Sequence, residues 1–176
     1  VSPSVAVLPF ANLSADKEQE YFSDGLAEEV ITLLSQVAGL KVIARTSSFA
    51  FRGKDDDVRR IGAALDVTHV LEGSVRRAGT RVRVTTQLVA AADGRQVWSE
   101  RYDRELSDIF AVQDEIATAI AGALRLTFST HGAPQRYTPA LPAYEAYLKG
   151  KHHQARITPD ALELARRCFE SAIALD

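Results

Sequence analysis

The sequence predicts an α/β protein with a mixed sheet of about five strands, three helices that cover it, and a helical hairpin after it. Three observations predict this class. Short apolar runs alternate with helical periodicity up to residue 66, three strand-like runs follow between 67 and 105, and helical periodicity returns from 108. The composition, with 46% hydrophobic and 25% charged residues, is typical of a globular domain and excludes a disordered or fibrous chain.

Strands and helices alternate at the start of the chain. Residues 4–10 form a short apolar run, which predicts a buried strand that ends at Pro9. From about 18 to 38, apolar residues recur at three- and four-residue steps, which predicts an amphipathic helix with Gly39 as its C-cap. Residues 40–44 are then a second buried strand, and residues 45–55 are expected to be a loop.

A second helix is predicted directly after three acidic residues. Asp55, Asp56 and Asp57 precede apolar residues at helical spacing from Val58 to Leu65. One of these aspartates is expected to cap the helix, because exposed amides and the helix dipole favour an anion there. A calcium loop is disfavoured, since the triplet lacks the alternating oxygen ligands and the glutamate of an EF-hand.

Residues 67–105 predict a three-stranded meander with two tight turns. A two-residue turn at Ala78-Gly79 would place Val75 opposite Val82 and leave one face of the hairpin apolar. In the second turn, a three-residue loop of residues 92–94 with a left-handed Gly94 would place Trp98 opposite Leu88. We prefer that loop to a two-residue loop at Asp93-Gly94 because it buries the only tryptophan, which is worth about 2–3 kcal/mol.

Three further helices complete the expected architecture. The first runs from about 108 to 127, with Ser107 or Asp108 as its N-cap, and the others cover about 141–155 and 159–175. Residues 129–140, between the first and the second of these helices, lack periodicity and are interpreted as a linker. The expected domains are therefore an α/β domain over 1–128, the linker 129–140, and a helix pair over 141–176.

Six segments carry a resemblance to one family, and they occur in its order. The segments are SVAVLPF with NLS (4–10, 12–14), YFSDGL (21–26), RTSSF (45–49), VLEGSVR (70–76), WSERYDR (98–104) and DIFAVQDEI (108–116). From residue 4 to about 127, the chain is similar to the TolB-amino-terminal-like domain of bacterial signalling proteins. The resemblance implies a mixed α/β sheet that sits between an N-terminal effector and C-terminal tetratricopeptide repeats (TPRs). The implied effector is a class III adenylate or guanylate cyclase domain or a winged-helix regulator, and no segment of this chain matches either.

Residues 141–176 resemble the opening of a TPR. Ala165, Phe169 and Ala172 match the small–aromatic–small spacing of the repeat's second helix, and Gly150 matches the glycine of the first if about three residues are inserted after it. One such helix pair cannot bury its own apolar face and needs neighbours. We therefore interpret both ends of the chain as cut from a longer protein.

One loop is a candidate ligand site. Arg45, Thr46, Ser47 and Ser48 follow a strand end, where ligands bind in open α/β sheets, and their hydroxyls, amides and guanidinium suit a phosphate or carboxylate. The alternative is a loop whose hydroxyls satisfy its own backbone. No glycine-rich phosphate fingerprint accompanies it.

Other polar residues predict structure rather than chemistry. His152 and His153 are adjacent on a helix and point about 100° apart, which is unsuited to a shared metal. His131 falls in the linker and His69 on a buried strand face. Arg76, Arg77, Arg81 and Arg83 are expected to form a solvated face, and Cys168 a partly buried helix position. No catalytic residue, cofactor or metal is predicted.

These observations favour a non-catalytic protein-interaction or sensor module of a larger bacterial signalling protein. The alternative is the regulatory region of a class III adenylate or guanylate cyclase whose catalytic domain lies outside this chain. The expected partners are proteins bound by the repeat surface, with no nucleic acid, no membrane span in this chain, and no prediction of oligomeric state. The location would be periplasmic if a membrane anchor precedes Val1, and otherwise cytoplasmic.

Overall fold

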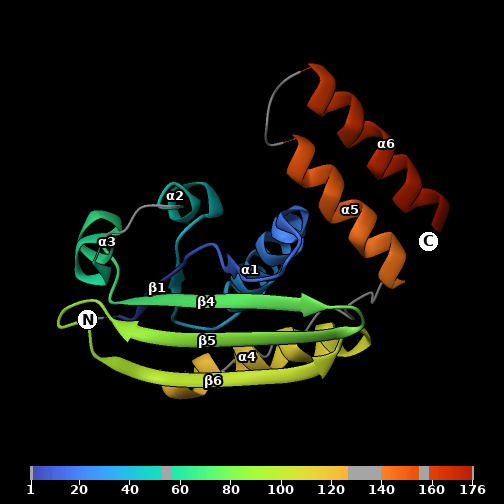
Figure 1. Cartoon of the computed structure of the whole chain (residues 1–176). Helices are drawn as coiled ribbons and strands as arrows, with labels where there is room; N and C mark the ends of the chain where they lie inside the picture. The colour runs from blue at the N-terminus through green and yellow to red at the C-terminus, as the bar shows by residue number, and fades with distance from the viewer. Residues whose placement is uncertain (1, 53–56, 127–139, 155–158, 176) are drawn as a thin grey trace.

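A mixed sheet with helices on both of its faces forms the centre of the computed structural model, and a helix pair lies beside it (Figure 1). The structure describes residues 2–52, 57–126, 140–154 and 159–175. The expected fold class is confirmed, with six strands rather than about five. The linker 129–140, except its last residue, lies outside the described residues, as do Asp55, Asp56 and His131.

The sheet has the order β3-β1-β4-β5-β6, and β2 pairs separately with β4. β1 is parallel to β3 and β4, whereas β4, β5 and β6 are antiparallel neighbours. The strands are β1 Ser4–Val7, β2 Ala11–Asn12, β3 Lys41–Val42, β4 His69–Ala78, β5 Arg81–Ala90 and β6 Gln96–Glu105. The helices are α1 Glu20–Leu34, α2 Arg45–Phe49, α3 Val58–Leu65, α4 Ile109–Ala123, α5 Leu141–Gln154 and α6 Pro159–Leu175, with short 3-10 turns at Lys17–Gln19 and Leu106–Asp108.

Alternation along the strands sends apolar side chains to two cores. Val5, Val7 and Leu71 join the larger core, which α1 and α4 cover with side chains such as Leu26 and Ile116. The smaller core lies on the opposite face, where Ala6 and Val70 pack with Ile61 of α3 and with Val67. β1 and the start of β4 are thus buried on both faces, while β5 and β6 keep one face open to solvent.

The end of α1 and the cap of α4 differ from the expected ones, whereas the expected cap of α3 is confirmed. α1 ends at Leu34, so Gly39 is not its C-cap, although Gly39 does adopt a left-handed φ of 80° in the following turn. The Asp57 side chain accepts a hydrogen bond from the Arg59 amide, so Asp57 is the aspartate that caps α3. Asp108 occupies the N-cap position of α4 without a side-chain cap, because a 3-10 turn precedes the helix there.

The meander is confirmed, but its first register is shifted by two residues. The turn is Gly79-Thr80, with Gly79 at φ 59°, so Val75 lies opposite Val84 rather than Val82. A shift of two keeps every side chain on its expected face. In the second hairpin, Trp98 lies opposite Leu88 as predicted and Gly94 is left-handed. The connection spans residues 91–95 rather than the expected 92–94, and a bulge at Leu88/Val89 compensates for the extra length. Trp98 packs against the large core but is only half-buried.

The helix pair docks on the sheet domain through α1 (Figure 1). Leu148 of α5 is buried, and a Cβ added to Gly25 of α1 would lie 2.6 Å from its Cδ1. Arg77 of β4 forms an ion pair of 3.1 Å with Glu145 of α5. Contacts from α1 and β4 therefore hold α5 against the sheet domain.

Candidate functional site

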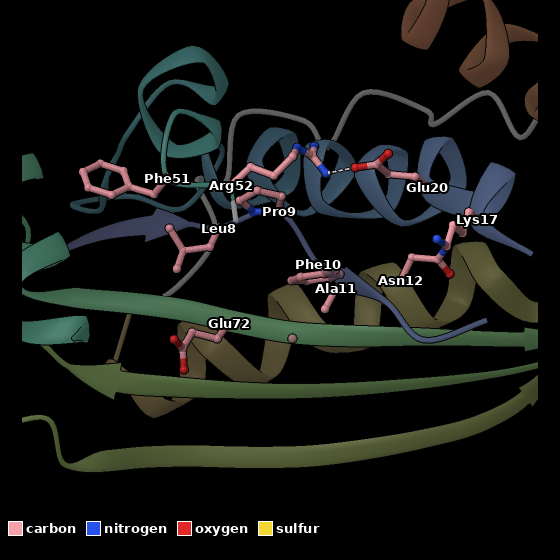
Figure 2. A pocket seen from close by; sticks show the side chains of 11 residues that line it. Leu8, Pro9, Phe10, Ala11, Asn12, Lys17, Glu20, Phe51, Arg52 and Glu72 are labelled. Atoms are coloured by element: carbon pink, nitrogen blue, oxygen red, sulfur yellow. Dashed lines mark hydrogen bonds and ion pairs between the residues drawn. The ribbon is translucent and has the colours of Figure 1, made fainter. Parts of the chain in front are cut away.

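The candidate site lies where β1 and β3 end and α1 and α2 begin (Figure 2). β1 stops at Val7, since Pro9 cannot donate to a ladder, and the chain then shifts to pair with a later part of β4 as β2. α2 starts three residues after β3. Polar side chains from α1 and from the α2 segment meet in this corner.

Arg52, just after α2, binds two carboxylates of α1. Its guanidinium pairs with Glu20 (dashed in Figure 2) and lies 2.7 Å from Asp24. The Asp24 side chain is only 10% exposed, and its second oxygen has no hydrogen-bond partner. Burial raises the pKa of Asp24 because it disfavours the charged form, and the bond from Arg52 offsets only part of this effect.

A second carboxylate links α2 to the helix pair. Glu28, one helical turn beyond Asp24, lies 3.0 Å from Nε of Arg45 and 2.7 Å from Nζ of Lys151 on α5. The Arg45 guanidinium also stacks 4.7 Å over the ring of Phe49. Because only 16% of the Glu28 side chain is exposed, this three-residue ion cluster is less screened than a surface pair.

The structure does not gather Arg45, Thr46, Ser47 and Ser48 around one point. They form α2, a helix rather than the expected loop, and the amides of Ser47 and Ser48 donate to the Ala44 carbonyl. Thr46 and Ser47 are exposed, whereas Ser48 is buried and its hydroxyl has no partner. Of the four, only Arg45 contacts a charged group, the carboxylate of Glu28.

Beside the Arg52–Glu20 ion pair is a cavity of about 500 Å³ (Figure 2). Apolar walls from Leu8, Phe10 and Phe51 face charged groups of both signs, which include Arg52 and Glu72. Such a lining suits a small ligand or a peptide side chain with an apolar body and a polar end. The remaining lining residues are Pro9, Ala11, Asn12, Lys17, Glu20 and Gly73.

Of the four arginines that were expected to form a solvated face, three have acidic partners. Arg81 lies 2.8 Å from Glu105 and Arg83 lies 2.7 Å from Asp103, both across the β5–β6 pair. Arg77 points to the other face, where it pairs with Glu145 and lies 5.4 Å over the ring of Phe22. The open face of the sheet is thus a mixed-charge surface rather than a basic patch.

The remaining candidates do not converge. Within the described part of the chain, no three His, Cys, Asp or Glu side chains are grouped as metal ligands, and no helix is long and apolar enough to cross a membrane. His152 and His153 belong to α5, and Cys168 is half-buried on α6. His69 is half-buried, with its Nδ1 2.8 Å from the Thr68 hydroxyl, and burial lowers its pKa.

Sequence reasoning missed the centre of the site, although part of the signal was visible. Glu20, Asp24 and Glu28 recur every fourth residue, which places three carboxylates on one face of α1. Their cationic partners, Arg52 and Lys151, come from segments distant in sequence, and no local pattern points to them.

Two solved structures share this architecture. TolB from Acinetobacter baumannii superposes with a TM-score of 0.51 at 19% identity, over 70% of this chain and 28% of TolB. Lipoprotein GNA1162 from Neisseria meningitidis superposes with a TM-score of 0.52 at 20% identity, over 67% of this chain and 96% of the lipoprotein. At this level of identity the likeness defines a TolB-like α/β fold.

The chain belongs to the family described as "HilA/YgeH-like transcriptional regulator, second domain", whose model matches residues 2–119. It is also 47% identical, over 177 aligned residues, to "Putative adenylate cyclase 3" of Rhizobium meliloti (strain 1021). That alignment covers 99% of this chain but only 30% of the relative. The chain thus spans less than a third of the length of this relative.

Proposed function

We propose that this chain is a non-catalytic interaction or sensor module of a larger bacterial signalling protein. One observation carries the proposal: the whole chain aligns with a minor part of a relative named as an adenylate cyclase, at 47% identity. The rest of that relative provides ample room for a separate effector. The family description, a second domain of transcriptional regulators, also fits a module that works beside an effector.

The docked helix pair gives this module a physical means of transmission. Glu28 contacts α2 on one side and α5 on the other, so movement of α2 would act on α5 through an ion pair. Leu148 packs against Gly25 and resists separation of the two helices. A ligand or partner that rearranged Arg52 and Glu20 would change the support of α1 beneath α5.

We further propose that α5 and α6 open a TPR array that binds protein partners. A Cβ on Gly150 would lie 2.6 Å from the Phe169 ring, so the glycine allows the close approach of the two helices. Ala165 is buried and Ala172 is half-buried on the same helix as Phe169. Repeats of this kind build concave surfaces for peptides, which need further repeats beyond residue 176.

We favour a class III adenylate or guanylate cyclase domain as the effector, because the relative is named as an adenylate cyclase. A transcription regulator is the second candidate, because the family description names one. The two differ in what the longer protein would do: the first forms a cyclic nucleotide, and the second binds a DNA site.

The proposal is tested with the 176-residue chain and with the longer protein that carries it. The chain alone, incubated with ATP or GTP and Mg²⁺ or Mn²⁺, should form no cyclic nucleotide above the protein-free control. In the longer protein, deletion of residues 1–176 should change the rate of cyclic nucleotide formation. Saturable formation by the chain alone would overturn the non-catalytic assignment, and DNA binding without cyclase activity would favour the second candidate.

A further inference from the structure

The outer edge of β6 is a ten-residue strand edge without a neighbour among the described residues (Figure 1). β6 is the last strand in the sheet order, and most of its residues are exposed. Its outward backbone N–H and C=O groups are a template for another strand. The opposite edge, β3, has only two residues and offers little to pair with.

The hydrogen-bond pattern shows which residues of β6 present their backbone to this edge. The Leu106 amide donates to the Thr80 carbonyl at 2.7 Å, so the backbone of Leu106, the residue after β6, faces the β5 side. The Glu100 carbonyl also faces β5, since it accepts from the Thr86 hydroxyl. Backbone direction alternates along a strand, so the odd-numbered residues from 99 to 105 face outward.

The charges of β6 are complementary to themselves when the strand is reversed. The segment Glu100-Arg101-Tyr102-Asp103-Arg104 has opposite charges at equal distances on the two sides of Tyr102. Two antiparallel copies centred on Tyr102 would place each Arg101 opposite an Asp103, and each Glu100 opposite an Arg104. Opposite charges across strands stabilise pairing, and like charges disfavour it.

The backbone and the charges select the same register. Outward-facing residues must oppose outward-facing residues, so allowed registers differ by steps of two. A step one way sets Arg101 opposite Arg101, and a step the other way sets Asp103 opposite Asp103. Of these registers, only the one centred on Tyr102 sets outward-facing residues opposite each other and also forms four opposite-charge pairs.

We propose that β6 pairs with β6 of a second copy of this chain, antiparallel and centred on Tyr102, to join two sheets into one. The inference is independent of the proposed function. Existing side-chain contacts are compatible with it. Arg83 and Arg101 already flank Asp103, and Glu115 of α4 lies 3.0 Å from Arg104, so Arg101, Asp103 and Arg104 keep intrachain partners in the monomer. The dimer adds a second partner from across the new strand pair.

A charge exchange tests the pairing in sedimentation equilibrium of the whole chain. The wild type should dimerise, and Asp103→Arg or Arg101→Asp alone should raise the dissociation constant about tenfold or more, because each sets like charges opposite each other. An equimolar mixture of the two variants should form heterodimers, since every 101–103 contact then joins opposite charges. Circular dichroism of each variant checks that the fold is retained.

The control variant is Glu105→Arg, which lies on the same strand but opposite Ser99 in this register. It should keep the wild-type dissociation constant within about threefold. Trp98, the only tryptophan, lies just beyond the paired segment, so its emission should shift with concentration in the wild type. A monomeric wild type, a mixture that stays monomeric, or a Glu105→Arg variant as weak as Asp103→Arg would overturn the proposal.

Discussion

The contact between Leu148 and Gly25 gives the sharpest test of how the helix pair is attached. Leu148 is 4% exposed, and Leu148→Ala removes its Cγ and both Cδ atoms. At about 0.8 kcal/mol for each buried carbon, the transfer cost is about 2.4 kcal/mol. Gly25 has no side chain that could turn into the void, so a cavity cost adds to this. We expect a loss of about 3 kcal/mol in the free energy of unfolding.

A size exchange separates this contact from a general weakening of α5. Gly25→Ala alone places a Cβ 2.6 Å from the Leu148 Cδ1 and forces α5 to shift. In the double variant, the new methyl group occupies part of the void. The double variant should therefore lose less free energy of unfolding than the two single variants lose together, by about 1 kcal/mol or more. Urea unfolding followed by circular dichroism measures all three variants.

Ile173→Ala is the matched control, because Ile173 is 78% exposed on α6. It should change the free energy of unfolding by less than about 0.5 kcal/mol. Strict additivity of the two substitutions, or a Leu148→Ala variant as stable as Ile173→Ala, would refute docking of α5 on α1.

Three further predictions concern charge and packing. The pKa of Asp24 is raised in the folded state, so the wild type should lose stability relative to Asp24→Asn as the pH rises from about 3.8. Urea titrations of both proteins at several pH values measure this loss, and parallel plots of unfolding free energy against pH would contradict it. Asp57→Ala should lower the melting temperature more at pH 7 than at pH 2, because the Arg59 guanidinium and amide lower the folded pKa of Asp57 to about 2 and part of the carboxylate's contribution is lost there; an equal effect at both pH values would exclude this cap. Gly150→Ala should cost about 1–3 kcal/mol by clashing with Phe169, and a Gly150→Ala variant as stable as wild type in urea would contradict the close approach.

The sequence was most informative where one physical signal dominated. Periodicity located all of the long helices, and alternation assigned the strand faces even though the first register was shifted by two. The face depends only on whether a residue is odd or even, whereas the register depends on which residue of Ala78-Gly79-Thr80 begins the turn. The left-handed φ of Gly79 places it first in the turn, which the sequence alone did not resolve.

Short elements and distant partners were not predictable in the same way. α2 has five residues and a polar sequence, so it lacks the periodicity that identifies a helix. The carboxylates of Glu20, Asp24 and Glu28 were visible as a helical stripe, but their partners Arg52 and Lys151 are fixed by tertiary packing. The candidate site is therefore a product of the fold rather than of a motif.

If the effector is the cyclase proposed above, the most direct test of the proposed transmission is the rate at which the longer protein forms cyclic nucleotide. Lys151→Glu sets two carboxylates together at Glu28 and breaks the ion pair between α1 and α5, while Arg166→Ala removes an exposed pair on α6 as a control. We predict that Lys151→Glu changes the rate and that Arg166→Ala does not. Equal rates for the wild type and Lys151→Glu would contradict a regulatory role for this contact.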